Sequence, residues 1–216
     1  MSGRGRRILG ATATGENGSA AGTAGQCGRI IVVRHGRPTL DKNAGPRLTW
    51  REYRDWWAAY ERASLADGQK PPRRLLYAVK DAPFVFSSIR PRAMETARAI
   101  AGDREIVTDD VFVEAPLPPP RWSEKRRYLP KTWNKIARVA WLFGHADGDE
   151  HIDDTRARAG AAADRLIAAA ETGQDAVLAA HGWFNRMLRP ELKRRGWTCR
   201  RDGGDSYWSF RIYEKR

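Results

Sequence analysis

Two short apolar runs, far apart in the chain, each lead into a His-Gly pair. The run Ile30 to Val33 precedes Arg34-His35-Gly36, and the run Ala176 to Ala180 precedes His181-Gly182. A continuous apolar run of this length is typical of a parallel strand covered on both faces. In open α/β sheets, ligands bind outside the carboxyl ends of such strands. We therefore expect an α/β three-layer sandwich, with a mostly parallel central sheet flanked by helices and both histidines facing one crevice.

A third apolar run, Phe84 to Phe86, leads into the segment Ser87-Ser88-Ile89-Arg90-Pro91-Arg92-Ala93-Met94-Glu95-Thr96-Ala97. Proline is favoured in the first turn of a helix, so this segment predicts a strand, a turn and a helix. Arg-His-Gly, Ser-Ser-x-x-x-Arg-Ala-x-x-Thr-Ala, a later acidic residue and a distal His-Gly follow one another here. This ordered set resembles the phosphoglycerate-mutase-like proteins of the histidine phosphatase superfamily. The resemblance extends from about Arg29 to Tyr213 and implies their fold and their phosphoryl chemistry.

The composition is that of a cytoplasmic protein with an excess of positive charge. The 39 Lys and Arg against 26 Asp and Glu give a formal charge of +13, which attracts anionic partners such as phosphate esters or nucleic acid. The arginines are spread along the chain, which favours a solvated basic surface over a nucleic-acid footprint. No stretch has the roughly 20 apolar residues that a membrane span needs. The two cysteines, Cys27 and Cys199, lack the spacing of a metal site or a disulfide framework, so a reducing compartment is expected.

We expect one folded unit with a tail and two insertions. Residues 1–28 are rich in Gly, Ala, Ser and Thr without periodicity, which predicts a disordered tail. Residues 29–216 form the catalytic domain, with insertions at about 46–75 and 115–148. The predicted helices are 48–62, 91–101, 131–143, 153–170 and 185–194, and further strands are predicted at 106–112 and 207–213. The aromatic residues of helix 48–62 favour packing, with a substrate-facing edge as the alternative.

His35 is the candidate nucleophile. A neutral imidazole that attacks phosphorus splits one displacement into two easier steps, because water then attacks the phosphohistidine. The resemblance gives the same role to the histidine of the Arg-His-Gly motif. Gly36 lets the backbone approach a phosphate closely.

Fixed positive donors should surround the phosphoryl group, because negative charge spreads over its oxygens during transfer. Arg34 and Arg92 match the phosphate-binding arginines of the superfamily, and a guanidinium fits phosphate oxygens with a planar fork of donors. His181 matches the distal histidine, which would donate to the same oxygens when protonated. Arg37 stands where relatives often have Glu or Gln, and it either adds a cation for the substrate or points to solvent.

Glu114 is the candidate general acid, because a leaving alkoxide needs a proton. It follows the predicted strand 106–112, at the place where the superfamily carries its acidic residue, and it leads into a loop with four prolines. A solvated loop carboxylate is the alternative.

These features predict a metal-independent phosphatase that hydrolyses small phosphate monoesters without a cofactor. A phosphoglycerate-type mutase is the close alternative, since both reactions share the phosphohistidine. Arg37-Pro38-Thr39 departs from the continuation typical of the mutases, which favours hydrolysis. A polyanion- or nucleic-acid-binding protein on the same scaffold is the alternative from another class.

Overall fold

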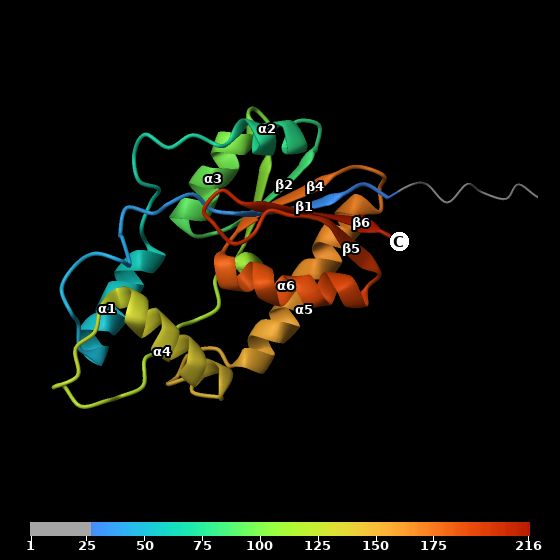
Figure 1. Ribbon diagram of the computed structural model, residues 1–216. Coiled ribbons are helices and arrows are strands. Elements are labelled where there is room, and N and C mark those ends of the chain that lie inside the picture. Colours follow the sequence, from blue (N-terminus) through green and yellow to red (C-terminus); the bar gives the residue numbers. More distant parts are fainter. Residues whose placement is uncertain (1–26) are drawn as a thin grey trace, which may run out of the picture.

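The computed structural model describes residues 27–216, which form a six-stranded sheet with helices on both faces (Figure 1). The strands are β1 (Ile30–Arg34), β2 (Phe84–Ser88), β3 (Ile106–Asp109), β4 (Ala176–Ala180), β5 (Trp197–Asp202) and β6 (Phe210–Lys215). Their order in the sheet is β3-β2-β4-β1-β6-β5. The first four strands are parallel, whereas β6 runs antiparallel to β1 and β5 antiparallel to β6. The predicted α/β fold with a mostly parallel sheet is confirmed.

Both faces of the central strands are buried, as their apolar sequences predict. Alternate side chains of a strand point to opposite faces. Ile31 and Val33 of β1 therefore pack with α2 (Arg73–Val79) and α3 (Pro91–Ala101). Ile30 and Val32 pack instead with α5 (Ile152–Ala170) and α6 (Gly182–Arg194). Figure 1 shows the first pair of helices above the sheet and the second pair below it.

Three predicted elements differ from the structure. No helix is predicted after Pro72, but α2 forms there because Leu75, Ala78 and Val79 are buried against the sheet. The strand predicted for 106–112 ends at Asp109, whose side chain accepts a hydrogen bond from the Val111 N–H and starts a 3-10 turn, η1 (Asp110–Phe112). The strand predicted for 207–213 is β6, and its partner β5 was not expected.

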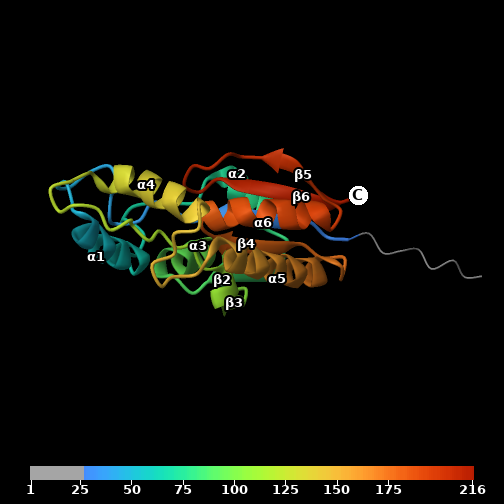
Figure 2. The ribbon, with the colours of Figure 1, turned by 90° about the horizontal axis from the view of Figure 1, so that it is seen from below.

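Parts of the two predicted insertions form a separate aromatic cap, which consists of residues 48–61 and 117–142. It contains α1 (Trp50–Glu61) and α4 (Pro130–Leu142), which lie beside each other and away from the sheet (Figures 1 and 2). Its own core is formed by Leu48, Trp50, Tyr53, Leu117, Trp133 and Ala137. The Trp133 indole donates to the Leu48 carbonyl at 2.7 Å, and Leu48 and Tyr128 exchange two backbone hydrogen bonds. Segments about 80 residues apart are thereby joined.

The expected tail, residues 1–28, lies outside the described residues except for Cys27 and Gly28. The Gly28 N–H donates to the Ala170 carbonyl at 2.8 Å. A Cβ on Gly28 would lie 2.0 Å from the Gln174 carbonyl oxygen, so this close approach requires glycine. None of the helices between residues 27 and 216 has the length and apolar content to cross a membrane.

Candidate active site

The two histidines of the His-Gly pairs lie side by side at the carboxyl edge of the sheet. Strands β1 and β4 are parallel neighbours, with Arg34 opposite Ala180, so the next residue of each strand reaches the same place. The His35 N–H donates to the Ala180 carbonyl at 2.9 Å. The two ring centroids are 5.2 Å apart, and both side chains are buried. The two histidines thus lie together as predicted, but only His35 lines the cavity.

The hydrogen bonds of His35 define which ring nitrogen carries the proton. Nδ1 lies 2.6 Å from the Gly36 carbonyl oxygen, which only accepts, so Nδ1 must be protonated. Nε2 accepts a bond from Arg92 Nε at 3.3 Å. Burial, followed by the positive charges of Arg92 and Arg34, holds the pKa of His35 well below 6.5. The imidazole is therefore neutral at pH 7, with its lone pair on Nε2.

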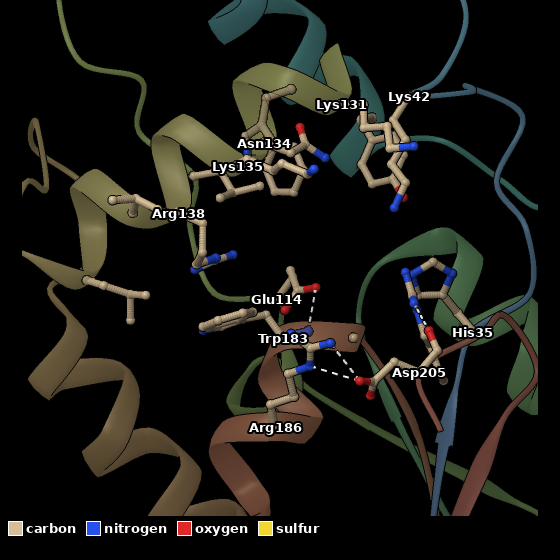
Figure 3. Close-up of a pocket in the computed structure, with 17 residues that line it drawn as sticks. His35, Lys42, Glu114, Lys131, Asn134, Lys135, Arg138, Trp183, Arg186 and Asp205 are labelled. Atoms are coloured by element: carbon tan, nitrogen blue, oxygen red, sulfur yellow. Dashed lines mark hydrogen bonds and ion pairs between the residues drawn. The ribbon is translucent and has the colours of Figure 1, made fainter. Parts of the chain in front are cut away.

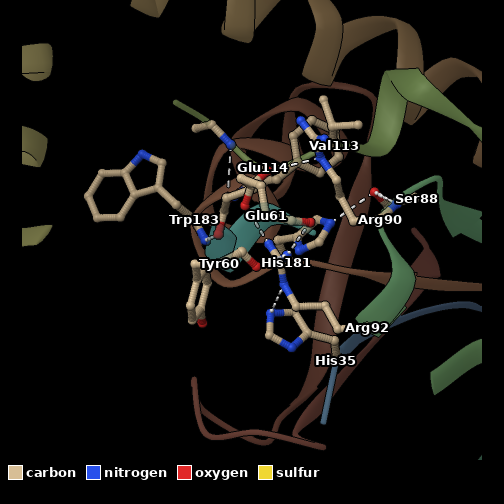
Figure 4. A network of polar contacts seen from close by, with 12 residues as sticks. His35, Tyr60, Glu61, Ser88, Arg90, Arg92, Val113, Glu114, His181 and Trp183 are labelled. Carbon is tan, nitrogen blue, oxygen red and sulfur yellow. Dashed lines mark hydrogen bonds and ion pairs between the residues drawn. The ribbon is translucent and has the colours of Figure 1, made fainter. Parts of the chain in front are cut away.

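Arg92 is fixed by a set of acceptors that leave it little freedom. It lies in the first turn of α3, which begins at Pro91. Its Nη1 donates to the Tyr60 and Glu61 carbonyls at 2.9 and 3.1 Å, and its Nη2 donates to a Glu61 carboxylate oxygen at 2.6 Å. The other carboxylate oxygen of Glu61 pairs with Arg90 at 2.9 Å. Figure 4 shows Glu61 between these two arginines, so the end of α1 orients the guanidinium beside His35.

Arg34 lines the same cavity as His35. Its guanidinium carbon lies 4.6 Å from the centroid of the Tyr207 ring, and its Nη1 donates to the Asp205 carbonyl. Its Nε is buried without a hydrogen-bond partner. A Cβ on Gly182 would lie 3.0 Å from this guanidinium, so the glycine after His181 makes room for Arg34.

His181 lies in the deepest part of the site. Its Nε2 is 2.9 Å from the Ser88 hydroxyl, whereas its buried Nδ1 has no partner. Burial, followed by the charges of Arg92 and nearby His35, holds the pKa of His181 well below 6.5. The imidazole is therefore neutral at pH 7.

Glu114 lies at the amino end of α6, where its carboxylate is held by backbone donors. One oxygen accepts from the N–H groups of Phe184 at 2.7 Å and Ala115 at 3.0 Å, and the other accepts from the N–H of Trp183 at 3.2 Å. A helix amino terminus presents such unpaired N–H groups and favours a negative charge. The carboxylate lines the same cavity as His35, so the structure brings the two together (Figures 3 and 4).

Gly36 and Arg37 are placed less directly at the site. The Gly36 N–H donates to the Thr96 hydroxyl at 3.0 Å, and a Cβ on Gly36 would lie 2.6 Å from the Trp208 ring. Packing against Trp208 thus explains this glycine in the structure. Arg37 is exposed and does not line the cavity, and its backbone bonds with the side chain of Gln69. A direct phosphate contact of Gly36 or Arg37 stays a prediction.

The site opens into a cavity of about 620 Å³ between the strand ends and the aromatic cap (Figure 3). Trp57 and Tyr60 of α1 line it, whereas Trp50 and Tyr53 of the same helix are packed in the core of the cap. The expected packing role and the alternative substrate-facing edge therefore both occur on one helix. Six cationic side chains line the cavity: Arg34, Lys42, Lys131, Lys135, Arg138 and Arg186. Residues 27–216 contain no cluster of three or more His, Cys, Asp or Glu side chains suited to a metal ion.

The sequence pattern of the histidine phosphatase superfamily (branch 1) matches residues 30–201. The chain belongs to this superfamily. Solved structures similar to this histidine phosphatase superfamily member include a phosphoserine phosphatase mutant from Entamoeba histolytica in complex with phosphoserine. That match has 17% identity and a TM-score of 0.51, and it covers 77% of this chain and 80% of the other. No sequence among the curated proteins matches.

Two further structures are similar to this superfamily member. A mycobacterial glucosyl-3-phosphoglycerate phosphatase has 18% identity and a TM-score of 0.51, with 78% of this chain and 81% of the other covered. A phosphoglycerate mutase from Bacillus anthracis has 16% identity and a TM-score of 0.51, with 80% and 83% covered. At these identities the similarity establishes the fold.

Some residues of the site were not identified from the sequence. Glu61 lies in an insertion, 31 positions before its partner Arg92, and no local pattern connects them. Lys131, Lys135 and Arg138 also belong to an insertion, and their spacing of four and three residues places them on one face of α4. That spacing was the available signal, but only the fold shows that this face lines the cavity.

Proposed function

We propose that this protein hydrolyses phosphate monoesters through a phosphohistidine formed at Nε2 of His35. The observation that carries the proposal is the state of this imidazole, which is buried and neutral and is flanked by two arginines. A neutral imidazole keeps the lone pair that attacks phosphorus, and the arginines supply the positive charge that a phosphoryl group needs.

The reaction consists of two displacements at phosphorus. In the first, the Nε2 lone pair forms a bond to phosphorus while the ester P–O bond breaks, and the leaving oxygen takes a proton from the Glu114 carboxyl group. Glu114 must first take up this proton against the three backbone N–H groups that favour its carboxylate. In the second, water attacks phosphorus as the N–P bond breaks, its electron pair returns to Nε2, and Glu114 takes the proton from the water. The sum is an ester and water converted into an alcohol and phosphate. Both steps use residues of this chain and need no cofactor.

Arg34, Arg92 and His181 bind the phosphoryl oxygens in this proposal. Arg92 and His181 border His35, and Arg34 precedes it in the chain. A phosphate anion beside His181 would favour the protonated imidazole, since an opposite charge at short range raises the pKa of a histidine. His181 would then act as a donor when substrate is bound.

The similar solved structures include two phosphatases and a mutase, so they support either reaction class at the level of the shared fold. The absence of the mutase-like continuation after Gly36 favours hydrolysis. A mutase would need the phosphohistidine shielded from water until a second acceptor arrives.

The test is hydrolysis of a panel of phosphate esters by the native protein, with and without a chelator. We expect chelator-resistant release of phosphate, and a loss of kcat/KM of at least about 10⁴-fold in His35→Ala. The matched control is His145→Ala, because His145 does not line the cavity. Turnover that survives in His35→Ala, or that a chelator abolishes, would contradict the proposal. Transfer of phosphate between two sugar or glycerate positions without release would instead indicate the mutase.

A further inference from the structure

The loop between β5 and β6, residues 203–209, contacts the residues around the candidate nucleophile. The Arg34 N–H donates to the Ser209 carbonyl at 2.9 Å, and the Trp208 N–H donates to the His35 carbonyl at 3.4 Å. The loop lies beyond the part of the chain that matches the superfamily pattern. The shared motifs therefore do not describe what this loop contributes to the site.

Tyr207 of this loop contacts two functional groups of the site at once. The Arg34 guanidinium carbon lies 4.6 Å from the centroid of the Tyr207 ring. The His35 imidazole lies 5.6 Å from the same ring, centroid to centroid, with an angle of 40° between the ring planes. A guanidinium is attracted to the face of an aromatic ring, and more strongly where water is excluded. The half-buried Tyr207 ring therefore restricts where the Arg34 guanidinium lies relative to His35.

Arg34 is held in a different way from Arg92. Arg92 is paired with the carboxylate of Glu61. Within the described residues no carboxylate pairs with Arg34, whose side chain makes one hydrogen bond, from Nη1 to the Asp205 carbonyl. A carboxylate would neutralise the guanidinium, whereas an aromatic ring orients it and leaves its charge available to the phosphoryl group. The Tyr207 ring thus does for Arg34 what an ion pair does for Arg92.

The loop is fixed on both sides of Tyr207. The Asp205 carboxylate pairs with two arginines, at 2.6 and 3.0 Å. Figure 3 shows one of these pairs, with Arg186. Trp208 has a φ of 60°, a left-handed conformation that bulky residues rarely adopt and that persists only where contacts hold it. Its indole donates to the Gln69 side chain at 3.1 Å, so the backbone around Tyr207 is held in place.

We propose that Tyr207 is a positioning residue, whose ring holds the Arg34 guanidinium beside His35 for the phosphoryl transfer. This inference rests on the proposed function, in which Arg34 binds the phosphoryl oxygens. Donors that are already in place stabilise the transition state without any rearrangement during the reaction. Loss of the ring should therefore lower kcat much more than it raises KM.

The first experiment compares Tyr207→Leu, which removes the ring, with Tyr207→Phe, which keeps it. With 4-nitrophenyl phosphate as substrate, kcat should fall about tenfold in Tyr207→Leu, while KM changes by less than about threefold. Tyr207→Phe should keep at least about half of the native kcat. Equal losses in the two variants, or a native kcat in both, would overturn the proposal.

The matched control is Tyr77→Leu on α2. The Tyr77 ring also contacts a cation, because Lys80 Nζ lies 5.0 Å from its centroid, but Tyr77 is 74% exposed and does not line the cavity. Its kcat should equal the native value. A tenfold loss in this control as well would mean that the effect of Tyr207→Leu is not specific to the site.

A second measurement separates positioning from a loss of folded protein. Inhibition constants do not depend on the folded fraction of a preparation, and orthovanadate resembles the five-coordinate transition state more closely than inorganic phosphate does. The inhibition constant of phosphate divided by that of vanadate should fall about tenfold in Tyr207→Leu and stay native in Tyr207→Phe. An unchanged quotient in Tyr207→Leu would contradict the proposal.

A third measurement tests whether Tyr207 acts through Arg34. When two groups act together, the second substitution has less effect once the first has been made. In an Arg34→Met background, Tyr207→Leu should therefore change the preference for vanadate over phosphate, measured by calorimetric binding, by less than about twofold. A tenfold change in this background would show that Tyr207 acts independently of Arg34, against the proposal.

The same binding measurement distinguishes this inference from the proposed function. If the native protein hydrolyses no phosphate ester, the proposed function fails, and the role of Tyr207 is judged from calorimetric binding of vanadate and phosphate to the native protein and to Tyr207→Leu. A preference for vanadate that falls about tenfold in the variant would support that role. The same preference in both proteins, or no binding of either anion, would overturn it.

Discussion

The strand-end site and the aromatic cap differ in how completely their buried arginines are hydrogen-bonded. At the strand ends, Arg92 is buried and fully bonded to Glu61 and to backbone carbonyls of the same helix end. In the cap, Arg138 is 8% exposed and keeps a buried nitrogen without a hydrogen-bond partner. A saturated arginine provides a fixed field for the reacting phosphoryl group.

The two regions also differ in how they are stabilised. The site belongs to strands β1, β2 and β4, which are the centre of the sheet and are buried on both faces. The cap has a separate aromatic core. The proposed chemistry is therefore held by the most buried part of the fold, whereas the cap contributes to the wall of the cavity.

The largest effect is expected on activity, when proton transfer by Glu114 at the strand ends is removed. Glu114→Gln should reduce kcat/KM by about 10³-fold for an alkyl phosphate, because the alkoxide then leaves without a proton. For 4-nitrophenyl phosphate, whose leaving group needs no proton, the reduction should be tenfold or less. Steady-state kinetics with both substrates measures the contrast. Equal reductions would remove Glu114 from the role of general acid.

Breaking the buried ion pair between Glu61 and Arg92 should have the next largest effect, which is on the free energy of unfolding. Glu61→Gln keeps the shape of the side chain but leaves Arg92 and Arg90 without their carboxylate. Breaking a buried pair from one side costs about 3 to 5 kcal/mol. Urea unfolding should show this decrease in the free energy of unfolding. A loss below about 1 kcal/mol would mean that Arg92 is held by the backbone carbonyls alone.

When the core of the cap is weakened, the cap should unfold locally while the sheet stays folded. Trp133 is fully buried between α4 and α1, and Trp133→Ala should destabilise the cap by about 3 kcal/mol. Hydrogen exchange should increase in α1 and α4 while the amides of β1 stay protected. Leu166→Ala, in the core beside the sheet, is the matched variant. Equal loss of protection in both regions would show that cap and sheet unfold together.

The two buried histidines should make stability depend on pH. Their folded pKa values lie below 6.5, the value expected in the unfolded chain, so the unfolded state binds more protons as the pH falls below 6.5. The free energy of unfolding should thus reach its full value above pH 6.5. Below that it should fall by up to about 1.4 kcal/mol per pH unit for each histidine. Urea unfolding between pH 7 and 5 measures the slope.

Single histidine variants show which group causes the slope of the free energy of unfolding against pH. His35→Ala and His181→Ala should each reduce it, whereas carboxylates titrate mainly at lower pH. An unchanged slope in both variants would mean that other groups cause the pH dependence.

The smallest effect is expected at the surface of the cap. Arg51 and Glu124 form an ion pair at 3.1 Å, but their side chains are 65% and 53% exposed. Exposed pairs contribute little, so Arg51→Gln should change the free energy of unfolding by less than about 0.5 kcal/mol. Comparison with Glu61→Gln then separates a surface pair from a buried one. A larger loss would indicate that this pair orders the cap.

Much of the site could be predicted because its residues follow buried strands. The apolar runs before His35 and His181 identify two central strands, and Arg92 follows a proline that starts α3. The cap, α2, β5 and the partners of Arg92 were harder to predict, since they depend on contacts between distant segments. Even the glycine after His35 has a role in the structure that its sequence context does not indicate, namely contact with Trp208.

The sequence by itself determined the superfamily and the central strands and led to the proposal of His35 as the reacting histidine, because apolar periodicity and short motifs are local properties of the chain. Only the tertiary structure decided that Glu61 fixes Arg92, that Glu114 meets the amino end of α6, and that Arg138 lines the cavity. Burial and charge pairing depend on residues tens of positions apart. Their energies exist only once the chain has folded and water has been excluded between them.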